Sequence, residues 1–425
     1  MSTMTDAPKS AFRPSQLIYD TRYRSITIQV VALILIVAGL WWLVDNTISN
    51  LNALGKDFNF GFLSSAAGYD INQMLIDYNN QMSHGRAAVV GILNTLLVAL
   101  LGCVTATVLG VIAGVLRLSK NWVVNKLMAV YVEGFRNVPL LLWIILIFAV
   151  VTESTPRPNE FRGEDPAASM ILADSIAITN RGTYIPTIRF TNSLSGDEAV
   201  ASQEGLTPVA SGSMDWLLIL GTLLISVIVI RVINTRATRI QEATGDRPNT
   251  LWVNLAVFFI PVGLVLFFLG ATIVKPYLKG FNFSDGVHLR NSLIALWIAL
   301  SLYTGAFIAE VVRAGILAVS KGQTEAASAL GLQPNRTMSL VVLPQAMRVI
   351  VPPLISQYLN LTKNSSLAIA VGYMDVRATL GGITINQTGR ELEGMLLLGL
   401  FYLVLSLLIS SVMNYYNNRT QLRER

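Results

Sequence analysis

The stretch KGQTEAASALG, residues 321–331, lies between two long apolar segments of a 425-residue chain. It predicts a short helix, because Ser320 and Gln323 match a capping box and Gly331 can adopt the left-handed geometry that ends a helix. Such a helix spans ~15 Å, and its side chains are too small to hold it against water. It therefore needs a larger groove. The groove lies either on another polypeptide, with Glu325 available for a charged contact, or on the chain's own spans.

The composition around this stretch is that of a membrane protein. Hydrophobic residues make up 53% of the chain, charged residues 13%, and the mean hydropathy is +0.55. A helix needs about 20 apolar residues to cross a bilayer, and we expect eight such spans. Their approximate bounds are 27–44, 88–116, 127–151, 216–234, 251–274, 291–309, 345–362 and 395–413.

The seventh span is irregular in sequence. It contains Arg348, Pro352 and Pro353 and follows Pro344. We expect its backbone to be broken or kinked, which a membrane tolerates only beside other protein or a water-filled cavity.

The distribution of cations predicts the orientation of the spans. With eight spans both termini lie on one side, and the segments on that side carry 17 of the 31 lysines and arginines. The positive-inside rule therefore places both ends in the cytoplasm. These cations are Lys9, Arg13, Arg22, Arg24, Arg117, Lys120, Lys126, Arg231, Arg236, Arg239, Arg247, Arg313, Lys321, Arg336, Arg419, Arg423 and Arg425. The basic charge is explained by this bias, so we expect no nucleic-acid partner.

Cysteine and histidine usage excludes two kinds of site. A single cysteine, Cys103, allows no intramolecular disulfide. His84 and His288 are far apart in external loops, so we expect no metal site.

Two further features concern packing and the external side. Residues 152–215 form an acidic external insert, and the run around Asn180, Arg181 and Gly182 predicts a β-hairpin. The hairpin serves either to guide a partner or as surface decoration. In the second span, four small residues recur at intervals of four, and we favour packing within the bundle over a subunit interface for them. They are Gly102, Ala106, Gly110 and Gly114.

The opening stretch also belongs to a longer pattern, which runs from the Glu-Ala-Ala triplet to a Leu-Pro pair. Its members are Glu325, Ala326, Ala327, Gly331, Val341, Leu343 and Pro344. The pattern resembles the EAA loop of bacterial ABC importer permeases, with Val341 where isoleucine is usual. In that family the loop sits in a cleft of the ATP-binding subunit and couples it to the permease.

The resemblance extends to NTLLVALLGCVTATVLGVIAGVLRLS, YVEGFRNVPLLL, SLYTGAFIAEVVRAGILAVSKGQTEAA and LPQAMRVIVPPLISQYLNLTKNSSLA, which look like the polar amino-acid branch. It implies an all-α polytopic fold with a five-helix type I (MetI-like) core formed by 87–151 and 291–413. The remainder looks like additions found in general L-amino-acid import systems, most like their first permease subunit. The implied divisions are 1–86, 87–151, 152–290 and 291–425, with the EAA loop at 320–344.

The energy source must come from elsewhere, because the sequence contains no G-x-x-x-x-G-K-[ST] phosphate loop. The chain is therefore not expected to be an enzyme or to hold a cofactor. The resemblance implies two ATP-binding subunits that bind ATP and Mg²⁺, a second permease subunit and a periplasmic amino-acid-binding protein, in the bacterial inner membrane.

Candidates for the substrate path are polar residues near the end of the seventh span. They are Gln357, Asn360, Thr362, Lys363, Asn364 and Ser365, with Tyr303 and Thr304 as weaker candidates. The alternative, which the sequence favours equally, is that Gln357 to Ser365 lie in an external loop and only face water.

Two charged pairs at a spacing of three residues are candidates for an inner gate or for structural ion pairs. Glu133 and Arg136, followed by Asn137, lie in the third span. Glu310 and Arg313 end the sixth span, where we expect them to brace the short helix.

These observations favour a permease subunit of an ATP-driven importer of L-amino acids. The alternatives are a secondary transporter or channel that acts alone, and a membrane scaffold without transport.

Overall fold

The computed structural model describes residues 21–53, 55, 57–163, 165–194 and 212–420. Eight helices in this part of the chain are long and apolar enough to cross a membrane, which confirms the expected number of spans. Among the predicted cations, Lys9, Arg13, Arg423 and Arg425 lie outside the described residues, as do residues 164 and 195–211 of the acidic insert.

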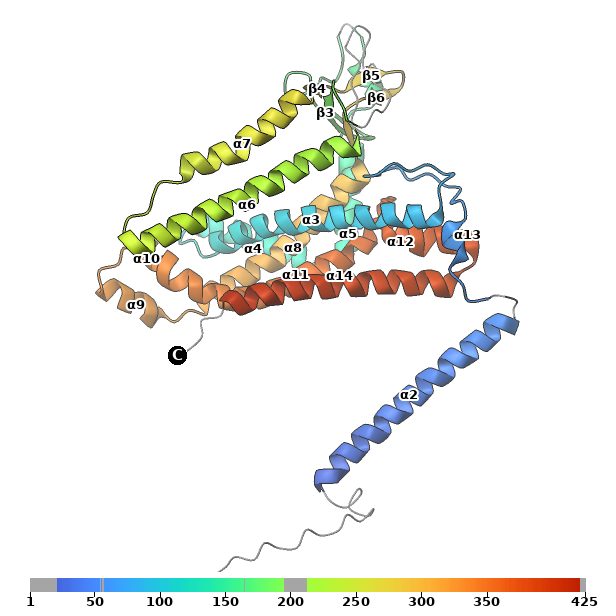
Figure 1. Ribbon diagram of the computed structural model, residues 1–425, viewed down its shortest axis with the longest axis horizontal. Coiled ribbons are helices and arrows are strands. Elements are labelled where there is room, and N and C mark those ends of the chain that lie inside the picture. The colour runs from blue at the N-terminus through green and yellow to red at the C-terminus, as the bar shows by residue number, and fades with distance from the viewer. Residues whose placement is uncertain (1–20, 54, 56, 164, 195–211, 421–425) are drawn as a thin grey trace, which may run out of the picture.

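The chain is mostly helical, with short strands gathered at one end of a helix bundle (Figure 1). The helices are α2 Thr21–Ala53, α3 His84–Leu116, α4 Trp122–Asn137, α5 Leu140–Glu153, α6 Ser213–Thr244, α7 Leu251–Phe268, α8 Asn291–Leu317, α9 Lys321–Ala329, α10 Pro334–Thr337, α11 Leu343–Asn364, α12 Val376–Ala378, α13 Ile385–Thr388 and α14 Glu391–Thr420. Short 3-10 and π segments are η1 Gly61–Ser64, η2 Pro158–Phe161, η3 Met338–Val342, η4 Ser365–Val371 and η5 Thr379–Thr384.

The strands form three small antiparallel sheets in the order β1-β2-β7, β3-β4 and β5-β6. They are β1 Ala177–Thr179, β2 Gly182–Ile185, β3 Thr187–Phe190, β4 Ala271–Val274, β5 Tyr277–Lys279, β6 Asn282–Ser284 and β7 Val287–Arg290. The predicted hairpin is β1-β2, in which Thr179 pairs with Gly182 around Asn180 and Arg181. We call this end of the bundle the strand end, and the opposite end, which carries α9 and α10, the α9 end (Figure 1).

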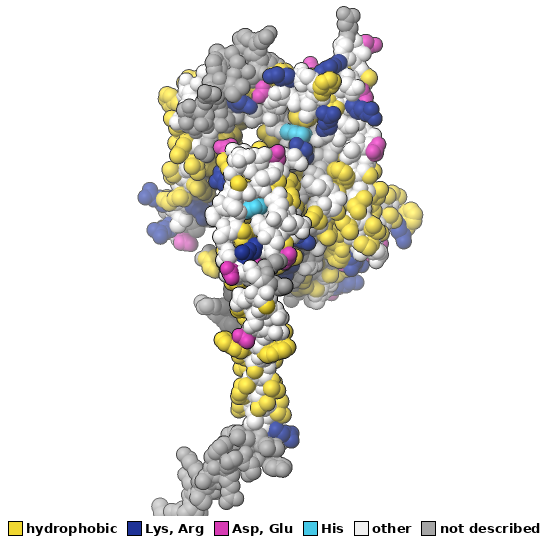
Figure 2. Space-filling model, turned by 90° about the vertical axis from the view of Figure 1, so that its right-hand side faces the viewer, with side chains coloured by type: hydrophobic (Ala, Val, Ile, Leu, Met, Phe, Trp, Pro, Cys, Tyr) yellow, Lys and Arg dark blue, Asp and Glu magenta, His cyan; other side chains and the backbone are white. Residues whose placement is uncertain are grey.

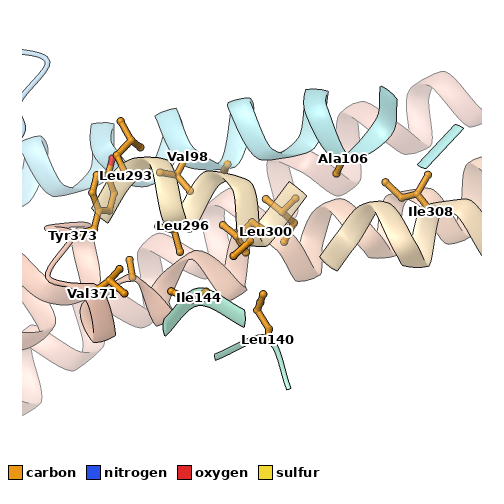
Figure 3. Packing of buried hydrophobic residues seen from close by; sticks show 14 of the residues in the cluster. Val98, Ala106, Leu140, Ile144, Leu293, Leu296, Leu300, Ile308, Val371 and Tyr373 are labelled. Atoms are coloured by element: carbon orange, nitrogen blue, oxygen red, sulfur yellow. The ribbon is translucent and has the colours of Figure 1, made fainter. Parts of the chain in front are cut away.

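Helix α8 is the centre of the bundle. Helices α3, α4, α5 and α11 pack directly against it, and α14 packs on α11. Side chains from α3, α5 and α8 and from the turn around Val371 and Tyr373 meet in one apolar core (Figure 3). The core joins segments that are far apart in the chain. Tyr373 also donates a hydrogen bond to the carbonyl oxygen of Asn94, 279 residues away, at 3.0 Å.

The contact between α3 and α8 depends on the small residues of α3. A Cβ on Gly110 would lie 2.6 Å from Ile308 and 2.8 Å from the Gly305 carbonyl oxygen, and a Cβ on Gly114 would lie 2.6 Å from the Ala309 carbonyl oxygen. Ala106 is fully buried in the same stripe. The stripe is therefore packed within the bundle, as the sequence predicts, and the two backbones approach closely.

The third predicted span, 127–151, is wrong as a single helix. The chain leaves helical geometry at Val138 and Pro139, which separate α4 from α5. Proline lacks an amide hydrogen and restricts the residue before it, so Val138 is extended. Only the segment that begins at Leu140 has the apolar composition of a span.

The backbone of the seventh span is irregular at positions other than its paired prolines. The α-helix α11 continues through Pro352 and Pro353, so the backbone is not broken there. The irregular backbone lies at its two ends, as the π segment η3 before it and the 3-10 segment η4 after it. The fifth span is shorter than the predicted 251–274, because Ala271–Val274 leaves the helix to pair with β3.

The remaining spans lie outside this core. Helices α6 and α7 form a hairpin whose main helix contacts are with each other. Helix α2 extends away from the bundle, and its most apolar 18-residue window is 0% buried within the described chain (Figure 1). Apolar side chains cover α2 and the flanks of the bundle, while charged side chains appear on the strand end (Figure 2). These flanks are suited to lipid or to partner helices.

The stripe on α3 leads to a test of the fold. Gly110→Ala should destabilise the protein by roughly 1–3 kcal/mol, because the added methyl group overlaps Ile308 and the Gly305 carbonyl oxygen. Thermal unfolding of the detergent-solubilised chain measures the effect. The matched control is Gly399→Ala on α14, where a Cβ meets no atom within 4 Å. That variant should keep or slightly raise the melting temperature, since alanine favours helix. Equal melting of both variants would contradict the close α3–α8 contact.

Candidate functional site

Helix α9 begins as the sequence predicts but is capped differently. Ser320 is the N-cap residue, yet its side chain forms no capping hydrogen bond, so the predicted capping box is wrong. The Gln323 amide donates instead to the Ser320 backbone oxygen at 3.1 Å. The Gln323 side chain is engaged elsewhere, because its Oε1 accepts from Gln345 Nε2 of α11 at 3.4 Å.

The end of α9 is fixed by Gly331. Its φ is +78°, in the left-handed region that favours glycine. The Gly331 amide donates to the Ser328 carbonyl at 2.9 Å, and the Leu332 amide donates to the Ala327 carbonyl at 3.1 Å. This pair of bonds is a Schellman motif, which stops the helix and turns the chain toward α10.

Most of α9 faces solvent. Ala327 is the buried residue of the helix, whereas Glu325 and Ala326 are exposed. The helix packs on α10 and η3, and a hollow of about 410 Å³ lies between its inner side and the last turn of α8. The chain therefore holds α9 by the side that carries Ala327 and leaves Glu325 and Ala326 open. Val341 is half-buried in η3, and Leu343 and Pro344 begin α11 with exposed side chains.

Glu310 joins two helices at the α9 end. It forms an ion pair with Arg313 at 2.9 Å on its own helix and a second ion pair with Arg117, which caps α3. We expected Glu310 and Arg313 to support α9. Through Arg117, Glu310 instead connects α8 to α3. Because α9 leaves directly from the end of α8, this connection fixes the base from which α9 starts.

Glu133 and Arg136 do not pair with each other in the described part of the chain. Glu133 accepts a hydrogen bond from Asn137 Nδ2 at 3.3 Å, and the Arg136 guanidinium lies 5.3 Å from the centre of the Phe307 ring of α8. Both residues are on α4 rather than on a transmembrane helix, since Pro139 ends α4 before the span begins. Arg136 therefore ties α4 to α8 through a cation–π contact.

The candidate path residues lie in helix, not in an external loop. Residues 357–364 belong to the last turns of α11, and Ser365 begins η4. Gln357, Asn360 and Asn364 share one face at spacings of three and four, with Asn360 exposed. Lys363 is also exposed. Thr362 and Ser365 are buried and donate to backbone oxygens one turn earlier, at 2.8 and 2.7 Å, so they present no free hydroxyl to a path.

Polar side chains also occur inside the bundle between α3 and α8. Trp297 Nε1 donates to Thr105 Oγ1 at 3.0 Å, and Thr105 is hydrogen-bonded to Ser301. The two weaker path candidates are nearby: Thr304 is buried, and the half-buried Tyr303 ring lies 5.1 Å from that of Phe307. This network satisfies polar groups within the core, which is a structural role.

A residue that sequence reasoning missed is Asp375, at the strand end between the seventh and eighth spans. Its side chain is fully buried, and its Oδ1 accepts the Ala378 amide at 2.9 Å as the N-cap of α12. Its Oδ2 has no hydrogen-bond partner in the described chain. Burial raises the pKa of this carboxyl to about 7. An acid placed directly after an apolar span was the signal available in the sequence.

This burial predicts a pH-dependent stability. The carboxyl has a higher pKa when folded, about 7, than when unfolded, about 3.9. Its stabilising contribution is therefore full below the unfolded pKa and lost as the pH rises through 7. Wild-type protein should melt at a lower temperature at pH 8 than at pH 5, and Asp375→Asn should flatten this difference. Asp77→Asn, at an exposed position, is the control and should retain it. An unchanged pH profile in Asp375→Asn would exclude a neutral buried carboxyl.

Comparisons with known proteins agree with this architecture. Residues 246–422 match the family of the binding-protein-dependent transport system inner membrane component. The chain is 56% identical over 433 residues to the glutamate/glutamine/aspartate/asparagine transport system permease protein BztB of Rhodobacter capsulatus. The alignment covers 100% of both chains. It is 41% identical to the general L-amino acid transport system permease protein AapQ of Rhizobium johnstonii, over 96% of this chain and 94% of that one.

Among solved structures, "Crystal structure of an amino acid ABC transporter with histidines" shares 17% identity and a TM-score of 0.43, over 79% of this chain and 95% of that chain. The two full-length relatives decide the family, because their identity extends through the core, α2 and the α6–α7 hairpin alike. The chain belongs to the inner-membrane components of binding-protein-dependent transport systems, among the permeases of amino-acid ABC transporters.

Proposed function

We propose that this permease carries L-amino acids into the cell, driven by ATP that separate subunits bind with Mg²⁺ and hydrolyse. The observation that carries the proposal is the open face of α9. Glu325 and Ala326 are exposed on a short helix that the chain holds by one side only. A helix of this length and composition needs a groove on another protein to be held fully.

The proposed partners are two ATP-binding subunits at the α9 end and a binding protein at the strand end. Support for the ATPase comes from the sequence, which has no phosphate loop of its own. Support for the orientation comes from the arginines and lysines of the described segments at the α9 end, which the positive-inside rule assigns to the cytoplasm. Both termini are then cytoplasmic, and the membrane is the bacterial inner membrane.

A second permease subunit would complete the path. The face of α11 formed by Gln357, Asn360 and Asn364, with Lys363 beside it, is partly exposed on this chain. Polar groups in the hydrocarbon region are costly unless protein or water covers them. A second, related permease packed against this side would cover them and enclose a polar route between the two subunits. The relatives' names support L-amino acids as the cargo.

The coupling role of α9 is tested with Glu325→Gln combined with Gly331→Ala. The first change removes the exposed charge, and the second forces an alanine into left-handed geometry at a cost of roughly 1–2 kcal/mol. In proteoliposomes that contain the whole transporter, ATP hydrolysis stimulated by the binding protein and amino-acid uptake should each fall at least about tenfold. The chain should still insert and assemble its membrane core.

The matched control is Gly322→Ala on the same helix, where a Cβ meets no atom within 4 Å and the backbone is not left-handed. This variant should transport normally. Normal uptake by the Glu325 and Gly331 double variant would contradict the coupling role. Uptake by the purified chain alone, without ATP, would instead support a transporter that acts by itself.

A further inference from the structure

The α6–α7 hairpin contains a groove that the transport core does not use. The groove has a volume of about 450 Å³ and lies within the membrane-spanning part of the hairpin. This volume is in the range of sites that hold small molecules. Its lining is almost entirely apolar, from Thr222, Ile225, Ser226 and Val229 on α6 and Ala256, Val257, Ile260 and Pro261 on α7.

Cations lie beyond one end of this groove. Helix α6 continues past its apolar part to Thr244 at the α9 end, and it carries Arg231, Arg236 and Arg239, followed by Arg247 in the loop to α7 (Figure 1). All four side chains are exposed. Glu242 and Asp246 are the carboxylates of this segment, and neither forms an ion pair with these arginines in the described chain.

The helix geometry aligns one of these arginines with the groove and places a second one beside it. Thr222, Ser226 and Val229 follow one stripe of α6 at spacings of four and three, and Arg236 continues it seven residues after Val229. Arg239, three residues further, is next to Arg236 on the helix surface. At ~1.5 Å per residue, Arg236 lies ~10 Å beyond the groove, a gap that its long side chain can shorten by reaching back. Arg231 points to the opposite side of the helix.

We propose that the α6–α7 hairpin binds an anionic phospholipid, with an acyl chain in the groove and the phosphate of the headgroup on Arg236 and Arg239. The geometry matches a lipid on both counts. An apolar chain occupies the apolar lining, and a negative phosphate meets two unpaired guanidinium groups at the level of the membrane surface. The distance along α6 from Thr222 to Arg236 is ~21 Å, which corresponds to one leaflet with its headgroup.

A transmembrane helix of a partner protein fits this site less well. The cytoplasmic ends of membrane helices are themselves flanked by lysine and arginine. A helix seated in the groove would bring such a flank against the four arginines of the hairpin. The charge therefore selects an anionic occupant, and the membrane supplies one.

Native mass spectrometry of the full-length chain in detergent tests the proposal, with phosphatidylglycerol and phosphatidylcholine added at equal concentration. Wild-type protein should retain phosphatidylglycerol in preference to phosphatidylcholine. Arg236→Gln with Arg239→Gln should weaken phosphatidylglycerol binding about 25-fold, from about fivefold for each arginine. Arg231→Gln, on the opposite side of α6, should leave it within about twofold.

Two further experiments test whether the apolar groove and the lipid headgroup both contribute to phosphatidylglycerol binding. Ala256→Phe fills the groove without touching the arginines and should also weaken phosphatidylglycerol binding, whereas inorganic phosphate should not displace the lipid. The proposal is overturned if Arg231→Gln weakens binding as much as the double variant, if phosphate displaces the lipid, or if wild type shows no preference for the anionic lipid. It is also overturned if Ala256→Phe leaves lipid binding intact while it prevents assembly with another subunit, because the groove is then a protein interface.

Discussion

The close approach of α3 and α8 determines the rest of the transport core. In a bilayer no hydrophobic force drives helices together, so association depends on packing and on hydrogen bonds. Gly110 and Gly114 allow the backbone of α3 to lie against Gly305 and Ala309 of α8 at distances that any side chain would prevent. Helix α8 then offers its other sides to α4, α5 and α11.

The same contact determines the position of the α9 helix. Arg117 at the end of α3 and Glu310 on α8 meet because the two helices run side by side to the α9 end. Helix α8 thus ends on a fixed base, and α9 leaves from it after a turn at Val319 and Ser320. A movement imposed on α9 by a partner would pass directly into the most buried helix of the bundle.

The segments outside the core differ from it in how much of their apolar surface is exposed. Helix α2 and the α6–α7 hairpin expose apolar side chains on most of their surface, so lipid or other subunits are their environment. The hairpin is joined at its α9 end by a small polar network in which Asn234 accepts hydrogen bonds from Thr250 and Asn254. At the strand end, β3 and β4 continue the hairpin as a paired ribbon beside β1, β2 and β7. These elements enlarge the subunit without altering the packing around α8.

The sequence alone determined the features that depend on local chemistry. Apolar runs of sufficient length predict the eight spans, the spacing of small residues predicts the packing face of α3, and Gly331 predicts the end of α9. The tertiary structure decided what depends on residues far apart in the chain. The break at Pro139 was not predicted from the sequence, and only the packing of α4 on α8 made Arg136 a partner of Phe307 rather than of Glu133. Helix α11 continues through Pro352 and Pro353.

Asp375 shows the same division. Its place after an apolar span can be read from the sequence, but its burial cannot, because the residues around it come from α3 and from the turns between the last two spans. The role of Glu310 likewise depends on Arg117, which is 193 residues away. Periodicity and turn chemistry act between neighbours in sequence, whereas burial and ion pairing depend on which distant segments the fold brings together.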